Sequence, residues 1–380
     1  MRPILILILA PAIVATPAWA QDPPQPPACA GEVARLGPAP HAAVAAEAFP
    51  TSTFTLTPGP DAGLDATMAR AITAMGSRSI GAAVLDEGGL WTGRVGSDQA
   101  PLFWWASAGK LAVAVAILQL VEEGRISLDD PVSTWVPEVP LGERITVRML
   151  LDHTSGLYSA NEADDVRADP RRRDLSELLA VARREGSLFC PGQAWRYSNT
   201  NYWVLGGVLE RIEGEPLDAI LTRRIIERGG LTGVRFVAPD DGLTDLEPLG
   251  PANTEAGEVE ARPNWVGAAG PMLATPEGAV ALLQAVLTNR LLEPDTIRAM
   301  LAEPWPMFNE PMFYGRGLML YEPPTQGPPI VWIGHSGGAP GVKAAMVWSP
   351  GDQAYAAVAL TGPGSAEAIA NALLNARRRP

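Results

Sequence analysis

The stretch from Leu111 to Val121 constrains the fold of this chain most strongly, because the helix that it predicts is apolar on every side. A helix without a polar face must be enclosed by other parts of the protein. The predicted helix begins near Ser107 and ends at Gly124. Its apolar core is well short of the roughly 20 residues that span a bilayer. The sequence therefore predicts a buried central helix rather than a membrane anchor.

Segments with helical and strand-like patterns surround this helix in a definite order. A helical spacing over 64–75 leads into two strand-like runs, 80–85 and 90–93, which predict a hairpin. The middle of the chain is mostly helical in pattern, with Thr146 and Thr275 as predicted helix caps. The order predicts an α+β fold with an all-helical part between two α/β parts. The closing part holds strand-like runs at 330–333, 344–348 and 354–361 and a helix over 365–377.

The first sixty residues predict a processed and exported protein. Residues 1–20 combine one cation, an apolar run and a small-x-small sequence, which predicts a cleaved signal peptide, a periplasmic or secreted location and no stable membrane anchor after cleavage. Residues 21–60 are rich in proline and predict a linker or an extended strap. In an oxidising compartment Cys29 and Cys190 either pair as a disulfide or remain two thiols, and the sequence leaves both possibilities open.

The charge and the histidine and cysteine content exclude several classes of partner. The 380 residues carry a formal net charge of -13, which argues against binding to nucleic acid. Three histidines and two cysteines are scattered without the spacing of metal ligands. We therefore expect no metal site and no cofactor, and a small molecule or a peptide as the substrate.

Ser107 and Lys110 form the first chemical signal, at the start of the buried helix. Residues three apart lie on one face of a helical turn. A serine hydroxyl is a weak nucleophile until a base takes its proton, and a lysine amine is that base only when its pKa is lowered. Of the 29 Lys and Arg residues, only Lys110 and Lys343 are lysines. Because arginine keeps its proton, a lysine at this place indicates a proton acceptor. The alternative is an N-cap serine beside a solvated lysine.

Two further motifs carry groups that acyl transfer needs. Tyr197 and Asn199 lie in a polar loop before a helix; a phenol relays a proton, and an amide side chain binds a substrate amide. In the segment 334–338, GHSGG, the N–H of Gly338 is a candidate oxyanion donor and His335 is a candidate carrier of charge or of a proton. Ordinary turn chemistry is the alternative for each motif.

The segment 334–338 also has the form G-x-S-x-G, in which Ser336 would be the nucleophile of an α/β-hydrolase. In such enzymes an acid and then a histidine follow the serine. No histidine follows Ser336, and the next segment has a strand-like rather than a helical pattern. We therefore expect Ser107 to be the nucleophile and Ser336 to bind substrate.

The three motifs together, in this order, resemble those of serine hydrolases related to class C β-lactamases and D-alanyl-D-alanine carboxypeptidases. They are S-x-x-K at 107–110, Y-x-N at 197–199 and H-S-G at 335–337. The likeness extends from about residue 61 to the end of the chain. Supporting stretches are ISLDDP at 126–131, LLDHTSGL at 150–157 and GPMLATP at 270–276.

The resemblance implies one serine hydrolase domain over 61–380, with the β-lactamase and penicillin-binding transpeptidase type of fold. An antiparallel sheet flanked by helices is expected from about 61–125 and 265–380. An all-helical part is expected at about 126–264, with the active site between the two parts.

The resemblance also implies a role for each motif residue. Ser107 would be the acylated nucleophile, Lys110 its proton acceptor and Tyr197 an aid to proton transfer. Asn199 would hold the substrate amide, and the backbone N–H groups of Ser107 and Gly338 would form the oxyanion hole.

His335 stands where β-lactamases of this family usually have lysine, and a histidine there is more similar to certain peptidases and esterases. His153 belongs to a recurring loop of the family and is expected to be structural. We therefore predict an exported serine hydrolase that forms an acyl-enzyme with D-amino-acyl peptides, in the manner of a carboxypeptidase, or with esters. The alternatives are a β-lactamase and a penicillin-binding or sensing module without turnover.

Overall fold

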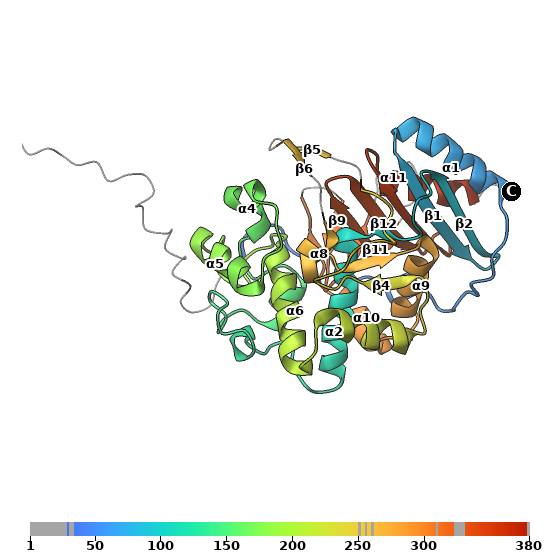
Figure 1. Cartoon of the computed structure of the whole chain (residues 1–380). Helices are drawn as coiled ribbons and strands as arrows, with labels where there is room; N and C mark the ends of the chain where they lie inside the picture. The colour runs from blue at the N-terminus through green and yellow to red at the C-terminus, as the bar shows by residue number, and fades with distance from the viewer. Residues whose placement is uncertain are drawn as a thin grey trace, which may run out of the picture.

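The computed structural model describes residues 29, 34–249, 252–254, 257–259, 262–308, 311–322 and 331–377. The predicted signal peptide at 1–20 lies outside them. The described residues form a central antiparallel sheet in the order β2-β1-β13-β12-β11-β10-β9-β8 (Figure 1). The predicted α+β class is therefore confirmed. The strands are β1 (Ser79–Asp86), β2 (Gly89–Gly96), β8 (Trp305–Pro306), β9 (Met312–Tyr314), β10 (Met319–Tyr321), β11 (Trp332–Ala339), β12 (Val342–Ser349) and β13 (Ala354–Thr361).

The first and last strands of the chain meet inside this sheet. β1 and β2 form the predicted hairpin, and β1 pairs on its other side with β13, where Ile80 lies opposite Leu360. Helices α1 (Ala62–Met75) and α11 (Ala366–Arg377) cover one face, and α9 (Pro276–Leu287) packs on the other (Figure 1). Almost every residue of β1, β12 and β13 is buried, as expected of strands that are covered on both faces.

The predicted central helix is α2 (Lys110–Glu122), in which every residue from Lys110 to Leu120 is buried. The helix begins later than the pattern predicted. Ser107 lies in η3, a 3₁₀ turn over Ala106–Gly109, and the α-helix starts only at Lys110. The reason is local, since Ala106 has a φ of 44°, a left-handed value that interrupts a regular helix.

The part of the chain predicted as all-helical also contains short strands. β4 (Val234–Phe236) pairs with β7 (Met272–Ala274), which pairs with β3 (Phe103–Trp104). β5 (Ala252–Thr254) and β6 (Gly257–Val259) pair with each other. Strands of two or three residues are too short to show an alternating pattern in the sequence. The remaining helices are α3 (Val147–Leu151), α4 (Asp164–Ala168), α5 (Leu175–Glu185), α6 (Asn199–Glu213), α7 (Leu217–Leu221), η6 (Thr222–Glu227), α8 (Pro263–Val266) and α10 (Pro294–Met300).

Both predicted threonine caps are present. The Thr146 hydroxyl oxygen accepts the N–H of Met149 at the start of α3. The Thr275 hydroxyl oxygen accepts the N–H of Gly278 at 3.2 Å, and Pro276 occupies the first position of α9. Both contacts satisfy N–H groups that the first turn of a helix leaves unpaired.

The glycine-rich segment 334–338 lies inside β11 and is not a turn. The sequence predicted a strand over 330–333, followed by a segment that was either a substrate-binding backbone or, as the alternative, a glycine-rich turn. β10 pairs with β11 only as far as Gly334, so the edge of β11 beyond this point is free to approach η3. A Cβ atom on Gly337 would lie 2.2 Å from the carbonyl oxygen of Trp105. Glycine is therefore required for this close contact.

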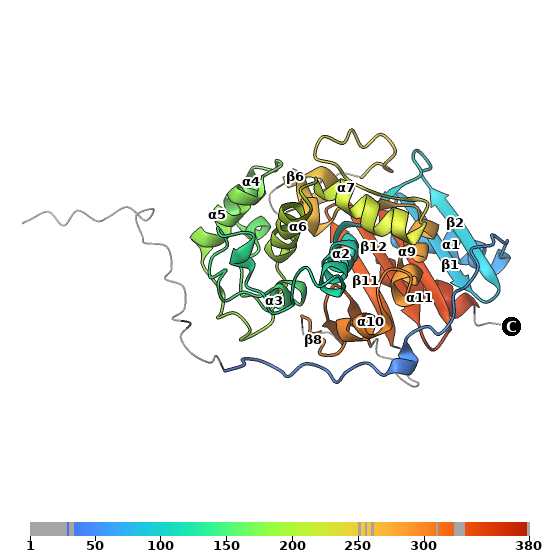
Figure 2. The same ribbon diagram turned by 90° about the horizontal axis from the view of Figure 1, so that it is seen from below.

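Residues 34–60, which we call the N-terminal strap, cross the molecule in extended form (Figure 2). Just before the strap, Cys29 forms a disulfide with Cys190. Further along, the Trp348 indole N–H donates to a strap carbonyl at 2.9 Å, and backbone bonds join the strap to Leu90 of β2. The strap thereby connects the helical part to an edge strand of the sheet.

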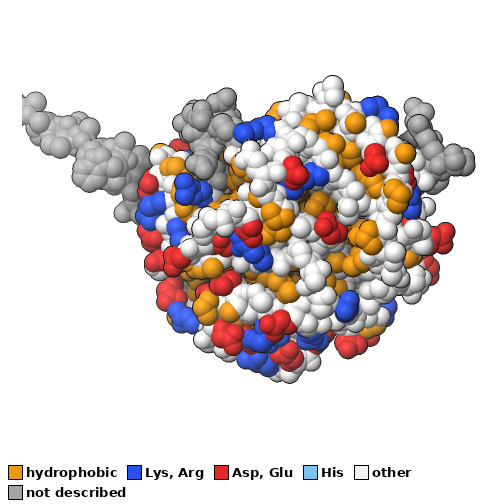
Figure 3. Space-filling model, turned by 45° about the vertical axis from the view of Figure 1, so that its right-hand side comes forward, with side chains coloured by type: hydrophobic (Ala, Val, Ile, Leu, Met, Phe, Trp, Pro, Cys, Tyr) orange, Lys and Arg blue, Asp and Glu red, His pale blue; other side chains and the backbone are white. Residues whose placement is uncertain are grey.

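Positive and negative side chains are interspersed over the face shown in Figure 3. This face has no continuous basic surface of the kind that binds a polyanion. Within the described residues, no helix is long and apolar enough to cross a membrane. The same residues contain no group of three or more His, Cys, Asp and Glu arranged to hold a metal ion.

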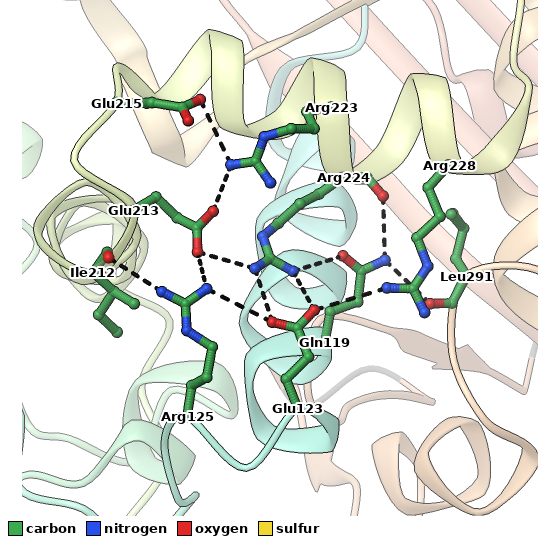
Figure 4. A network of polar contacts seen from close by, with 10 residues as sticks. All are labelled: Gln119, Glu123, Arg125, Ile212, Glu213, Glu215, Arg223, Arg224, Arg228 and Leu291. Carbon is green, nitrogen blue, oxygen red and sulfur yellow. Dashed lines mark hydrogen bonds and ion pairs between the residues drawn. The ribbon is translucent and has the colours of Figure 1, made fainter.

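An ion-pair network joins the ends of α2 and α6 to the helix formed by α7 and η6 (Figure 4). The guanidinium of Arg224 donates to both carboxylate oxygens of Glu123, at 2.8 and 3.0 Å, and to Glu213 at 3.0 Å. Glu213 also accepts from Arg125 and Arg223. Only 6% of the Arg224 side chain and 5% of the Glu213 side chain are exposed. The side chains of Gln119, Glu215 and Arg228 extend the network.

Candidate active site

Ser107 and Lys110 are in contact where η3 meets α2. Lys110 Nζ lies 3.0 Å from Ser107 Oγ. The same nitrogen lies 2.8 Å from Asn199 Oδ1 and 2.5 Å from the carbonyl oxygen of Ala269. The last two oxygens only accept hydrogen bonds, so each takes one N–H of the amine.

These three oxygens can accept the three N–H groups of an ammonium, or they can surround a neutral amine. A neutral primary amine has two N–H groups and one lone pair. When Asn199 and Ala269 take the two N–H groups, the lone pair faces the hydroxyl of Ser107. Lys110 is completely buried, and this burial lowers the pKa of its amine well below the usual range. The amine is therefore placed and poised to accept the proton of Ser107.

The amide of Asn199 is fixed by partners on both sides. Its Nδ2 donates to Asn161 Oδ1 at 3.0 Å, and its Oδ1 accepts from Lys110. The backbone N–H of Asn199 donates to Ser159 Oγ, also at 3.0 Å. A substrate amide that binds Asn199 through Nδ2 must therefore replace or share the contact with Asn161.

Tyr197 lies beside the amine, with Lys110 Nζ 5.0 Å from the centre of its ring. The hydroxyl of Tyr197 is buried and has no hydrogen-bond partner within the described residues. Burial raises the pKa of Tyr197, and the nearby Ser107 hydroxyl offsets part of the rise. The phenol consequently keeps its proton at neutral pH. An unpartnered O–H beside the nucleophile is suited to donating to a leaving group.

The structure places His335 in the interior, and its side chain does not line the cavity at Ser107. His335 is completely buried; its Nδ1 lies 2.6 Å from the carbonyl oxygen of Ser336 and its Nε2 lies 3.1 Å from Tyr314 Oη. The carbonyl accepts only, so Nδ1 carries the proton and Nε2 accepts from Tyr314. Burial lowers the pKa of His335 to about 3. The imidazole is therefore neutral and acts as an acceptor.

Ser336 also lies away from the expected substrate position. Its hydroxyl is 3.7 Å from the sulfur of Met319, and it is not among the residues that line the cavity at Ser107. The reason is that the segment forms a strand, in which consecutive side chains point to opposite faces. The strand presents its backbone edge to the nucleophile instead.

A cavity of about 780 Å³ opens beside the nucleophile. Ser107, Asn199 and Gly338 line it together, so the two predicted oxyanion donors border one space. The side chains of Lys110, Tyr197 and His335 do not belong to its lining. Its apolar walls include Leu178, Trp203, Trp265, Val266 and Pro340, and Arg167, Arg171, Arg173 and Arg262 also lie on its border.

A family model described as Beta-lactamase matches residues 64–378 of the chain. The chain belongs to the β-lactamase family. This assignment confirms the resemblance that the three motifs indicated, and it makes the protein a hydrolase of that family.

The curated relatives of this β-lactamase-family chain include a protein named as a penicillin-binding protein and one named as an esterase. It is 35% identical over 135 residues to the putative penicillin-binding protein PbpX of Bacillus subtilis, a match that covers 35% of this chain and 32% of that protein. It is 35% identical over 159 residues to esterase EstB of Burkholderia gladioli, which covers 37% and 39% of the two proteins. These matches span about a third of the length of the relatives.

Solved structures match a larger share of the chain. A D-stereospecific amidohydrolase from Streptomyces is 29% identical with a TM-score of 0.72, and the match covers 82% of this chain and 98% of that one. A D-amino acid amidase from Ochrobactrum anthropi, in complex with D-phenylalanine, has a TM-score of 0.70 at 21% identity, over 83% and 98% of the two chains. The second likeness supports the fold alone.

The sequence did not reveal three groups that hold this β-lactamase-family site together. The carbonyl of Ala269 and the amide of Asn161 fix Lys110 and Asn199, and Tyr314 holds His335. Every residue type has a backbone carbonyl, so the sequence does not show which carbonyl will bind Lys110. The stretch 270–276, which directly follows Ala269, was the available clue.

Proposed function

We propose that this β-lactamase-family hydrolase cleaves esters and D-amino-acyl amides, including D-amino-acyl peptides, through an acyl-enzyme on Ser107. The contact of the buried Lys110 amine with Ser107 Oγ, with two other acceptors taking its N–H groups, carries the proposal. Burial favours the neutral form of a lysine held in this way, and the neutral amine is the form that accepts a proton.

In the acylation step, Ser107 Oγ bonds to the substrate carbonyl carbon while its proton passes to Lys110 Nζ. The negative charge on the carbonyl oxygen faces the backbone N–H groups of Ser107 and Gly338. The bond to the leaving group then breaks, the leaving group takes the proton of Tyr197, and the Lys110 ammonium restores that proton. In the second step a water molecule attacks the acyl carbon and gives its proton to the same basic groups. The bond to Ser107 Oγ then breaks, and Oγ takes a proton back, which restores the free serine.

The cavity and the relatives support this substrate class. Its walls are largely apolar side chains, among them Trp203 and Trp265, which suit an apolar acyl or side-chain group. One relative is named an esterase, and a 29% identical structure is described as a D-stereospecific amidohydrolase.

We also propose that the protein acts outside the cytoplasm. The disulfide between Cys29 and Cys190 supports this location, because structural disulfides persist in oxidising compartments. The signal-peptide composition of residues 1–20 supports it as well. Fractionation of cells and mass measurement of the mature N-terminus test this part.

The decisive experiment compares the wild type with Ser107→Ala on a p-nitrophenyl ester, a D-alanine p-nitroanilide, a D-Ala-D-Ala peptide and a chromogenic cephalosporin. We expect turnover of the ester and the D-amides, little turnover of the cephalosporin and none by Ser107→Ala. Cephalosporin as the best substrate would indicate a β-lactamase. Covalent labelling of Ser107 by a penicillin without turnover would indicate a penicillin-binding module. Neither labelling nor turnover would overturn the proposal.

A further inference from the structure

His153 is a buried residue that the proposed reaction does not use, and its backbone is strained. It is completely buried, and its φ of 63° lies in the left-handed region, which residues other than glycine adopt uncommonly, although histidine does so more often than most. Strain of this kind persists only where the surrounding contacts enforce it. The contacts of the imidazole therefore need an explanation.

The hydrogen bonds of His153 determine which nitrogen carries its proton. Nδ1 lies 3.2 Å from the backbone N–H of Ser198 and 2.9 Å from Asn201 Nδ2. The Asn201 amide is oriented by Ser155, whose hydroxyl donates to Oδ1 while its oxygen accepts from the N–H of Leu157. Both partners of Nδ1 are thus donors, and Nδ1 is the acceptor. The proton is on Nε2, which has no hydrogen-bond partner within the described residues.

The imidazole holds Tyr197 in two ways. Its ring lies 4.2 Å from the Tyr197 ring, centre to centre, with an angle of 36° between the planes. Its Nδ1 holds the N–H of Ser198, which directly follows Tyr197 in the chain. On its other sides the imidazole contacts Tyr314, with ring centres 4.6 Å apart, and Tyr202, at 5.3 Å. The Tyr197 ring also contacts Tyr314, with centres 5.8 Å apart, and Phe308, at 6.4 Å, but His153 is nearer than either and is the one that also holds the backbone beside it.

We propose that His153 is a positioning residue that fixes the Tyr197 phenol toward the leaving group, by stacking on its ring and by anchoring the backbone beside it. This inference rests on the proposed function, in which Tyr197 donates a proton to the leaving group. A purely structural histidine would support the fold without any preference for one leaving group.

The test uses the leaving group as its readout. A p-nitrophenolate leaves without receiving a proton, whereas an alkoxide must be protonated as it leaves. We compare the p-nitrophenyl and ethyl esters of the same acid, with the wild type and His153→Asn. Asparagine tolerates the left-handed backbone and keeps an acceptor for Ser198, but it removes the ring that packs on Tyr197. Tyr197→Phe serves as the reference for loss of the proton donor.

We expect His153→Asn and Tyr197→Phe to lower kcat/KM for the ethyl ester at least about tenfold more than for the p-nitrophenyl ester. The two esters form the same acyl-enzyme, so kcat/KM is the constant that reports the step in which the leaving group departs. Val204→Ala, a buried truncation in the same helix as Asn201, is the packing control. It should change the rate constants for the two esters by the same factor. An equal loss on both esters in His153→Asn, or no loss, overturns the proposal.

A second variant separates the two contacts and guards against misfolding. His153→Phe keeps a ring against Tyr197 and removes the acceptor for Ser198, so we expect a smaller change in the ratio of the two esters. If both His153 variants fail to give folded protein, as judged by circular dichroism, His153 is structural and the proposal is wrong. A wild type that hydrolyses neither ester contradicts the proposed function itself, which is a different outcome.

Discussion

At the scale of single residues, the proposed site requires the amine of Lys110 to be uncharged. Lys110 has no carboxylate partner within the described residues, and its three contacts are with a hydroxyl, an amide oxygen and a backbone carbonyl. A buried ammonium without a counter-charge is costly, so burial favours the neutral amine. The burial that raises the free energy of the Lys110 ammonium also makes the neutral amine available as a base.

Replacing Lys110 by arginine should abolish turnover. The guanidinium keeps its proton at all relevant pH values, so we expect kcat/KM on a p-nitrophenyl ester to fall by roughly 10²–10⁴-fold. Lys343→Arg is the matched control, because Lys343 is the other lysine of the chain and is exposed. Circular dichroism should show both variants folded. A rate near that of the wild type in Lys110→Arg would contradict the role of proton acceptor.

The pH dependence of kcat/KM should show an acid limb that belongs to Lys110. The amine works only when unprotonated, so activity rises as the pH rises through its pKa. Because burial lowers that pKa, the limb should lie well below the ordinary lysine value of 10.5. His335, with a pKa of about 3, stays neutral over this range. A limb that remains near 10.5 would show that the amine is charged in the resting enzyme.

At the scale of secondary-structure elements, charged side chains join three helices at the end of α2. Glu213 accepts hydrogen bonds from three arginines. Burial opposes its ionisation, but the bonds from Arg224, Arg223 and Arg125 prevail and lower the pKa of Glu213 to about 2. The carboxylate thus stabilises the folded state fully at pH values above its ordinary pKa of 4.5. This contribution is lost as the pH falls through the pKa of about 2 that the group has in the folded protein.

Glu213→Gln should therefore destabilise the protein at neutral pH. Three guanidiniums lose their shared counter-charge, and we expect the free energy of unfolding to fall by about 3 kcal/mol. Urea denaturation at pH 7 measures the change. Glu215→Gln is the control, because Glu215 is exposed and, among the described residues, pairs with Arg223 alone, at 3.5 Å; its effect should stay below about 1 kcal/mol. Equal effects in the two variants would contradict the argument.

Local sequence patterns predicted the elements better than they predicted the contacts between them. The contact of Ser107 with Lys110 follows from their spacing on one helical turn. The carbonyl that fixes Lys110 comes from Ala269, 159 residues later, and no local pattern reveals such a contact. The burial of His335 likewise depends on Tyr314 from another strand. For the glycines at 334–338 the sequence left a turn open as the alternative, whereas Gly337 is needed for the close contact of β11 with η3.

At the scale of the whole molecule, the helical part and the sheet are joined by the N-terminal strap as well as by their packed core. The disulfide closes a loop between positions 161 residues apart. In the chain-entropy model such a loop stabilises the folded state by up to about 5 kcal/mol. The strap and the disulfide therefore act across both parts of the fold.

The double variant Cys29→Ser, Cys190→Ser should unfold at a lower temperature than the wild type. Thermal unfolding in the absence of reductant measures the shift. As a control, dithiothreitol should lower the Tm of the wild type to that of the variant and leave the variant unchanged. An identical Tm for oxidised wild type and variant would show that the disulfide adds nothing to stability.

The disulfide also restrains the loop that leads to Tyr197. Cys190 precedes Tyr197 by seven residues, and the carbonyl of Gln193, in the same loop, accepts the N–H of Leu36 in the strap. Reduction of the disulfide would therefore remove one of the tethers between this loop and the N-terminal segment, whereas the contact between Ser107 and Lys110 lies within η3 and α2 and does not involve the loop.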